Sequence, residues 1–276
     1  MEKKLFTIIG NPVSHSLSPV LHNFWFNKYK LDYEYTATEA NENQLEGIIT
    51  KIKNKELAGA NVTLPFKQKV IPFLDKLVND AKETNSVNTI YRDNDGLIIG
   101  DNTDVYGVQA GYLKEMPLKK RSKKILVMGA GGVAPSIIFS LLKSNIGDIS
   151  LSNRTLDKSI FIKKKFPKIS VIDWSDLEIN LKIFDIIINA TSLGLNKNDN
   201  FQFDIDKIKL SATFIDTIYN PIETNIIKKL KQKKIKTMNG LNMFMYQGQK
   251  SFYIWTKQNP EIDQDLINLL ESKIKI

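Results

Sequence analysis

The segment from Asn61 to Lys67 places an amide, a hydroxyl and an amine at the end of an apolar run, in the order Asn-Val-Thr-Leu-Pro-Phe-Lys. Because proline fixes φ and lacks a backbone N–H, the extended chain is expected to stop near Leu64 and to turn Lys67 in a new direction. Asn61 and Thr63 are expected on the same side of their strand, since side chains alternate with a period of two. Strand ends of this kind are where α/β proteins tend to build sites. The segment is a candidate functional site, although a strand with solvated polar ends has the same pattern.

Three other groups of polar residues stand at the ends of expected elements in the first part of the chain. They are residues 14–18 (Ser-His-Ser-Leu-Ser), 86–89 (Ser-Val-Asn-Thr) and 100–104 (Gly-Asp-Asn-Thr-Asp). Their hydroxyls, amides and carboxylate, together with the amine of Lys67, suit a ligand with several hydroxyl groups and a carboxylate of its own. Each group alone also fits a turn or a cap, and Ser18, which precedes a proline, is expected to cap a helix.

A glycine-rich segment indicates a dinucleotide site in the second part of the chain. Residues 125–134 read as an apolar strand, a glycine-rich turn and the start of a helix. Gly129, Gly131 and Ala134 fill the three positions of the G-x-G-x-x-G/A fingerprint, which serve the tight turn, the approach to pyrophosphate and helix packing. The helix N-terminus offers N–H groups and a positive dipole end to the phosphates. A purely structural glycine turn is the alternative.

The end of the next expected strand favours NADP over NAD. An NAD site typically has an acidic residue about 20 residues after the turn, where it binds the ribose hydroxyl. This chain instead has Asn153, Arg154 and Thr155 there, with Lys158 one helical turn later. A guanidinium can pair with a 2′-phosphate through two hydrogen bonds. The alternative is a set of exposed basic residues at a helix start.

Composition bounds the class of protein. At 276 residues, with 42% hydrophobic and 25% charged residues, the chain is long enough for one large domain or two ordinary ones. It contains no apolar run of about 20 residues and no signal sequence, so we expect a cytoplasmic protein without membrane association. Zero cysteines and two histidines leave little for disulfides, thiolate chemistry or a transition metal, and no metal site is expected.

The formal charge of +9 comes from lysines spread over many segments. A nucleic-acid binder would more often gather its basic residues with aromatic residues on one face. The pattern indicates solvated helix faces and a positive field that helps to recruit anionic small molecules. We expect no nucleic-acid partner, and salt-dependent retention on DNA would indicate the opposite.

Apolar runs alternate with segments of helical period, which indicates α/β layers with parallel strands. In the first part we expect strands at residues 5–10, 33–38, 57–64, 87–92 and 97–100, with helices at 18–29, 44–53 and 103–116. The strands at 87–92 and 97–100 flank a good hairpin turn, so the first sheet should be mixed. After a basic connector at 117–124 we expect strands at 125–128, 149–152, 169–172, 184–189, 214–218 and 235–238, with helices at 133–144, 224–233, 242–258 and 262–274.

The motifs, taken in order, resemble the shikimate dehydrogenase family nearly from end to end. The matching segments are residues 10–12 (Gly-Asn-Pro), 15–19 (His-Ser-Leu-Ser-Pro), 61–67, 87–89 (Val-Asn-Thr), 100–104, 129–132 (Gly-Ala-Gly-Gly), 153–155 (Asn-Arg-Thr), 189–192 (Asn-Ala-Thr-Ser), 216–221 and 239–247. With the alternation above, the resemblance implies a two-domain α/β fold with a cleft between the domains. A mixed-sheet substrate domain would span 1–106 and be joined by the helices in 241–276, and a Rossmann-type parallel NADP domain would span 107–240.

The resemblance also implies an activity: NADP-dependent interconversion of 3-dehydroshikimate and shikimate in aromatic amino-acid biosynthesis. Lys67 and Asp104 would form the catalytic pair, and Ser16 and Ser18 would bind the substrate carboxylate. The other implied substrate residues are Thr63, Asn88, Asp104, Tyr219 and Gln247. The implied cofactor residues are Gly129, Ala130, Gly131, Gly132, Val133, Ala134, Asn153, Arg154, Thr155, Lys158, Thr191, Ser192 and Gly240.

The chain departs from the family pattern in small ways. Pro135 and Ser136 stand where basic or alanine residues often follow the glycine turn, and Val105 replaces a common glycine. Lys158 is often an arginine in relatives, so affinity for the 2′-phosphate could be lower. A quinate/shikimate dehydrogenase that uses NAD and a non-catalytic ligand sensor are the alternatives, and the presence of Lys67 and Asp104 argues against the sensor. The sequence leaves open a monomer or a homodimer.

Overall fold

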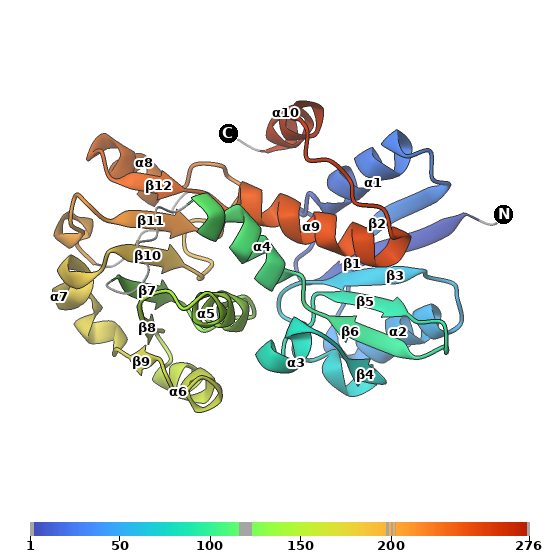
Figure 1. Cartoon of the computed structure of the whole chain (residues 1–276), viewed down its shortest axis with the longest axis horizontal. Coiled ribbons are helices and arrows are strands. Elements are labelled where there is room, and N and C mark those ends of the chain that lie inside the picture. Colours follow the sequence, from blue (N-terminus) through green and yellow to red (C-terminus); the bar gives the residue numbers. More distant parts are fainter. Residues whose placement is uncertain (1–2, 116–122, 197–198, 200, 202, 275–276) are drawn as a thin grey trace. The chain divides into compact units, whose positions relative to one another are not determined.

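Two six-stranded sheets organise the chain, each within its own unit (Figure 1). The first unit comprises Met1–Gly107 and Met245–Lys273, and the second comprises Val108–Phe244 and Ile274–Ile276. The computed structural model describes residues 3–115, 123–196, 199, 201 and 203–274. Residues 117–122 of the predicted connector at 117–124 therefore lie outside the described part.

The sheet of the first unit is mixed, as predicted, with strand order β2-β1-β3-β5-β6-β4. Its strands are β1 (Lys4–Gly10), β2 (Tyr33–Glu39), β3 (Gly59–Val62), β4 (Lys76–Leu77), β5 (Thr89–Arg92) and β6 (Ile98–Asp101). β1 pairs in parallel with β2 and β3, whereas β5 is antiparallel to both β3 and β6. The short edge strand β4 was not predicted, because two residues are too few to show a period of two.

The helices of the first unit follow the predictions with two differences: the short helix Asp80–Thr84 was not predicted, and one helix is shorter than predicted. They are α1 (Ser18–Lys28), α2 (Leu45–Lys53), α3 (Asp80–Thr84) and α10 (Gln264–Lys273), and the chain passes between the units within α4 (Asp104–Gly111) and α9 (Leu241–Thr256). The helix predicted at 103–116 is shorter, since α4 ends at Gly111. A Cβ at Gly111 would lie 2.6 Å from the backbone nitrogen of Met243, so close backbone packing accounts for a glycine that is a poor helix former.

The sheet of the second unit is parallel in all its described pairings, with strand order β12-β11-β10-β7-β8-β9. Its strands are β7 (Lys124–Met128), β8 (Asp148–Ser152), β9 (Ser170–Val171), β10 (Ile186–Asn189), β11 (Thr213–Asp216) and β12 (Lys236–Met238). The order reverses at β7, which lies between β8 and β10. In open α/β sheets, ligands bind at the carboxyl ends of the strands beside such a reversal, and the glycine-rich turn follows β7 directly.

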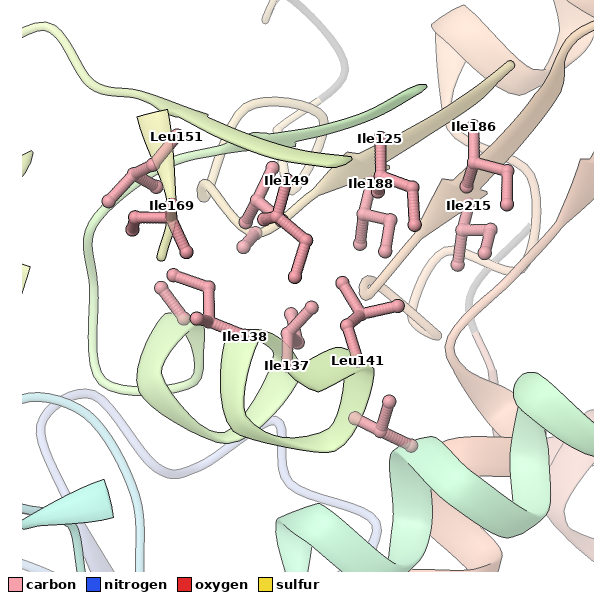
Figure 2. Close-up of a cluster of buried hydrophobic side chains, with 14 of the residues drawn as sticks. Ile125, Ile137, Ile138, Leu141, Ile149, Leu151, Ile169, Ile186, Ile188 and Ile215 are labelled. Atoms are coloured by element: carbon pink, nitrogen blue, oxygen red, sulfur yellow. The ribbon is translucent and has the colours of Figure 1, made fainter. Parts of the chain in front are cut away.

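Four helices accompany this parallel sheet in the described residues: α5 (Ala134–Lys143), α6 (Leu156–Lys165), α7 (Leu177–Asn180) and α8 (Asn225–Gln232). Figure 2 shows Ile137, Ile138 and Leu141 of α5 directed toward isoleucine side chains of the strands, and all three are fully buried. This packing fixes α5 against the sheet. The 3₁₀ turns among the described elements are Glu42–Gln44, Ile71–Phe73, Leu113–Glu115, Trp174–Asp176, Leu181–Ile183 and Ile205–Lys207.

Only the start of α6, near Arg154 and Lys158, was considered from the sequence, and no helix over its length was predicted, because its apolar residues do not form one inward face. Phe161 is 63% exposed and Leu156 and Ile160 are each 40% exposed, whereas Ser159 is fully buried. An amphipathic helix is recognised by a periodic apolar stripe toward the core, and this helix has none. None of the described helices is long and apolar enough to cross a membrane.

The aromatic core of the first unit encloses a histidine. His22 is fully buried and stacks on Tyr35 with 4.5 Å between ring centroids. Neither ring nitrogen has a hydrogen-bond partner in the described part of the chain. Burial disfavours the imidazolium ion and lowers the pKa of His22 to about 3. His22 is a neutral core residue, which leaves it no part in proton transfer.

We expect His22 to make folding sensitive to acid. The unfolded chain binds a proton at His22 near the ordinary pKa of 6.5, and the folded chain does so only near about 3. Between these values the unfolded state binds more protons, so the free energy of unfolding falls by up to about 1.4 kcal/mol per pH unit as pH decreases. His22→Phe should remove this part of the dependence. Denaturant unfolding of both proteins across this window measures it, and equal slopes would contradict the prediction.

Candidate active site

The turn after β3 brings Lys67 out of the sheet. β3 ends at Val62, earlier than the predicted strand end at residue 64. Leu64 and Pro65 are exposed, and Phe66, only 2% exposed, anchors the turn in the core. The backbone oxygen of Lys67 then accepts the N–H of Val87 at 2.8 Å. Burial of Phe66 and this hydrogen bond fix the backbone on both sides of the Lys67 side chain.

Lys67 forms an ion pair with Asp104 in the first unit. Its Nζ donates to Asp104 Oδ2 at 2.5 Å, and the two side chains are 11% and 6% exposed. Asp104 is the first residue of α4, where the positive end of the helix dipole favours a carboxylate. A largely buried ammonium with a carboxylate partner is suited to hold or move a proton on a bound molecule.

The amide of Asn88 completes this group. Its Nδ2 donates to the second Asp104 oxygen, Oδ1, at 2.9 Å and to Gln247 Oε1 at 3.3 Å. Its Oδ1 accepts the backbone N–H of Thr103 at 2.8 Å, which fixes the orientation of the amide. The structure thus brings together Lys67, Asp104, Asn88 and Gln247 from separate parts of the chain.

Ser16 and Ser18 form a second polar pair. The hydroxyl of Ser16 donates to Ser18 Oγ at 3.1 Å, and the N–H of Ser18 donates to Ser16 Oγ at 3.2 Å. The prediction that Ser18 caps a helix is wrong: α1 begins at Ser18, its N-cap residue is Leu17, and no side chain caps it. Ser18 Oγ therefore contacts its neighbour's hydroxyl rather than the helix backbone.

Two further predicted substrate residues lie outside these groups. Thr63 is partly buried and its N–H donates to the backbone of Ile9, with no hydrogen bond to Lys67 or Asp104 in the described residues. Tyr219 belongs to the second unit, where it stacks on Phe244 with 4.4 Å between centroids. The substrate contact of Tyr219 stays a prediction.

The turn after β7 has the geometry of a phosphate-binding turn. Gly129 has φ +103°, and a Cβ there would lie 2.8 Å from the carbonyl of Ala190, so this position requires glycine. The atom nearest to a Cβ at Gly131 would be the backbone oxygen of Ala190, at 3.9 Å. The protein's own packing does not demand glycine at 131, whereas a pyrophosphate against the backbone would. The turn fits a dinucleotide, with α5 beginning at Ala134.

Asn153 holds the turn, while the basic residues beside it are exposed. Asn153 Oδ1 accepts the N–H of Ala130 at 3.0 Å, and its Nδ2 donates to the backbone of Thr155 at 2.8 Å. Arg154 and Lys158 are exposed and form no ion pair in the described part of the chain. They are available to an anionic group, and Asn153 itself has a structural role that the sequence did not predict.

Thr191 is positioned by two residues to which the sequence assigned no role. Its hydroxyl donates to Asn189 Oδ1 at 2.6 Å, and Asn189 Nδ2 donates to Asp216 Oδ1 at 3.0 Å. Asp216 is fully buried, and burial raises its pKa to about 6. Asn189 and Asp216 are the last residues of the neighbouring strands β10 and β11. A polar residue at a strand end is the sequence signal that could have identified both. The next residue after Thr191, Ser192, is exposed.

Gly240 is required by backbone packing. Its N–H donates to the oxygen of Ile218 at 2.9 Å, and a Cβ there would lie 2.2 Å from the oxygen of Thr217. A contact between Gly240 and a cofactor stays a prediction. Within the described residues, no group of three or more His, Cys, Asp or Glu side chains could hold a metal ion.

Comparison with known proteins identifies the family. Residues 8–90 match the family model described as shikimate dehydrogenase substrate binding domain, and residues 113–243 match shikimate / quinate 5-dehydrogenase. A shikimate dehydrogenase (NADP(+)) of Pelagibacter ubique is 47% identical over 269 residues, which cover 98% of this chain and 99% of that protein.

Solved structures agree with this match. Shikimate dehydrogenase from Aquifex aeolicus superposes with a TM-score of 0.88 at 36% identity, over 98% of this chain and 97% of the other. Shikimate 5-dehydrogenase from Thermus thermophilus, in complex with NADP(H) and shikimate, gives 0.85 at 27% identity, over 98% of each chain. This chain belongs to the shikimate dehydrogenase family.

Proposed function

We propose that the chain catalyses the NADP-dependent, reversible reduction of 3-dehydroshikimate to shikimate, a step of aromatic amino-acid biosynthesis, and that Lys67 and Asp104 are its catalytic pair. The observation that carries the assignment of the pair is the ion pair itself: an ammonium and a carboxylate 2.5 Å apart, each mostly buried, in a member of this family. The first unit binds the substrate in this proposal, and the second binds NADP.

Lys67 stabilises the charge on the reacting oxygen by proton transfer. Negative charge builds on the ketone oxygen during reduction, and the Lys67 ammonium donates a proton to it; in the oxidation of shikimate its neutral form accepts the alcohol proton. NADPH supplies the hydride when it is bound. Asp104 holds the Lys67 side chain and accepts a hydrogen bond from a neighbouring substrate hydroxyl.

The remaining polar residues orient the substrate. Ser16 and Ser18 present two adjacent hydroxyls, which suit the two oxygens of the substrate carboxylate. Asn88 contacts both Asp104 and Gln247, and the two amides bind substrate hydroxyls. Thr63 and Tyr219 are the remaining residues that we assign to the substrate. Holding a reactant in one orientation lowers the barrier by making the reaction effectively unimolecular.

The second unit binds the cofactor through its phosphates and its adenosine. The backbone from Gly129 to Ala134 binds the pyrophosphate at the start of α5, and the basic residues Arg154 and Lys158 bind the 2′-phosphate with Asn153 and Thr155 beside them. Thr191, Ser192 and Gly240 lie along the rest of the cofactor. We place the protein in the cytoplasm as a monomer or homodimer.

One assay tests the proposed function. Purified protein is mixed with shikimate and NADP⁺, and formation of NADPH is followed by absorbance. We expect turnover, with much slower turnover when NAD⁺ replaces NADP⁺ or quinate replaces shikimate. Equal or faster turnover of quinate with NAD⁺ would favour a quinate dehydrogenase, and absence of NADPH formation would favour a ligand sensor.

Replacing Arg154 and Lys158 together by alanine should weaken selection of NADP. Hydrogen bonds to charged groups contribute about 1.5–3 kcal/mol, so we expect KM for NADP⁺ to rise about 10- to 100-fold with little change in KM for NAD⁺. Steady-state kinetics with both cofactors measure this ratio. The control removes two lysines from the last turn of α6, Lys163→Ala with Lys164→Ala, and carries the same charge change. If KM for NADP⁺ rises equally in the control, the effect comes from net charge rather than from contacts with the 2′-phosphate.

A further inference from the structure

A ring of hydrogen bonds starts and ends on the Asn88 amide. Asn88 Nδ2 donates to Thr103 Oγ1 at 2.9 Å, and Thr103 Oγ1 lies 3.1 Å from Ser251 Oγ. Ser251 Oγ lies 2.8 Å from Thr89 Oγ1, which donates to Asn88 Oδ1 at 3.1 Å. All three hydroxyl residues are at most 1% exposed. Water is thus excluded from the hydroxyls, and their hydrogen-bond partners come from within the protein.

The chemistry of the amide restricts the hydrogen bonds at the two ends of the ring. Nδ2 can only donate and Oδ1 can only accept, whereas each hydroxyl can do both. One arrangement of the protons runs from Asn88 Nδ2 to Thr103, then to Ser251, then to Thr89 and back to Asn88 Oδ1. Thr103 Oγ1 also lies within hydrogen-bond distance of Asn88 Oδ1, at 3.1 Å, and Ser251 Oγ of the backbone oxygen of Gln247, at 3.1 Å. In that arrangement each hydroxyl donates once within the ring, and Asn61 Nδ2 supplies a further donor to Thr89 Oγ1 at 3.1 Å. Hydrogen bonds in such a series polarise one another in a buried site.

Ser251 is the member that comes from a distant part of the chain. It lies on α9 one turn after Gln247, whose side chain also accepts from Asn88. Asn61 Nδ2 donates to Ser251 Oγ at 3.1 Å and to the backbone oxygen of Asn88 at 2.9 Å. Asn61, the first residue of the Asn61–Lys67 segment, thus supports the ring with its amide.

We propose that Ser251 is a positioning residue: by closing this ring it fixes the Asn88 amide so that Nδ2 faces Asp104 and bound substrate. The inference rests on the proposed function for its effect on catalysis, but the ring itself is defined by the protein alone. Without the Ser251 hydroxyl, Thr103 and Thr89 each lose a partner. The amide keeps the backbone N–H of Thr103 on Oδ1 and Asp104 on Nδ2, but its hydroxyl partners hold it less firmly.

Ser251→Ala should lower kcat/KM for shikimate and weaken shikimate binding, measured by calorimetry without cofactor, each by about 3- to 10-fold, the equivalent of one hydrogen bond. KM for NADP⁺ should not change. The control is Ser140→Ala, which removes a fully buried hydroxyl that donates to the oxygen of Ser136 in the same helix, α5, at 2.7 Å. If Ser251→Ala does not fold, Thr89→Val opens the same ring with little change in shape and should give the same loss.

Two measurements separate positioning from a general loss of structure. In an Asn88→Ala background, Ser251→Ala should cause no further loss of kcat/KM, because Ser251 acts through Asn88. Hydrogen exchange of the Asn88 side-chain amide, followed by NMR without ligand, should be faster in Ser251→Ala and unchanged in Ser140→Ala. Additive losses, or unchanged amide exchange, would overturn the proposal. Because amide exchange needs no substrate, it tests the ring even if the wild type fails to oxidise shikimate, a result that would refute only the proposed function.

Discussion

Lys67→Met is expected to lower kcat for shikimate oxidation by about 10²- to 10⁴-fold, the usual contribution of a positioned acid–base group. Methionine keeps the length of the side chain but can neither donate nor accept the proton. KM for shikimate should change much less, because the serine pair, Asn88 and Gln247 remain to hold the ground state. Steady-state kinetics over a range of shikimate concentrations, at saturating NADP⁺, separate the two constants.

Lys69→Met is the matched control for this experiment. Lys69 follows Lys67 by two residues and is 43% exposed, and its ion pair is with Glu42 rather than with Asp104. The Lys69→Met variant should retain nearly all activity. An unchanged kcat in Lys67→Met would remove Lys67 from the proton transfer, and a large loss in Lys69→Met would assign the effect to charge in the segment.

The sequence was most informative where local rules alone determine structure. Pro65, which has no backbone N–H, lies in the turn that follows β3, and Gly129 adopts a positive φ that excludes a side chain. The alternation of strands and helices predicted a mixed sheet followed by a parallel one, and the structure confirms both. These features depend on residues that are close in sequence, so their patterns are visible without the tertiary structure.

What the sequence did not predict depends on partners that are distant along the chain. Ser18 follows the capping rule, but its hydroxyl bonds to Ser16 instead of a helix N–H. Asn61 has the appearance of a ligand residue, and only the fold shows that Tyr35 and Ser251 use its amide. The exposed apolar residues of α6 remove the periodic stripe by which a helix is recognised.

Asp104→Asn should have the second largest effect, a loss of about 10²- to 10³-fold in kcat/KM. Asp104 receives donors on both oxygens, from Lys67 on Oδ2 and from Asn88 on Oδ1. An asparagine there has one accepting oxygen and one donating nitrogen, so one of the two donors must face another donor. Asp101→Asn is the control, since Asp101 is also buried and accepts N–H groups of Asn79 and Asn102. The Asp101→Asn variant should have a lower free energy of unfolding without a comparable loss of kcat/KM.

A double-mutant cycle shows whether the two residues act as one unit. If Asp104 serves catalysis mainly by holding Lys67, the variant that combines Lys67→Met and Asp104→Asn should be about as slow as Lys67→Met alone. Residues that act together are strongly non-additive, because removing one already removes the function of the other. If the two losses in kcat/KM instead multiply, Asp104 contributes to the transition state independently of Lys67, through its own contact with the substrate. The buried ion pair at 2.5 Å favours the first result.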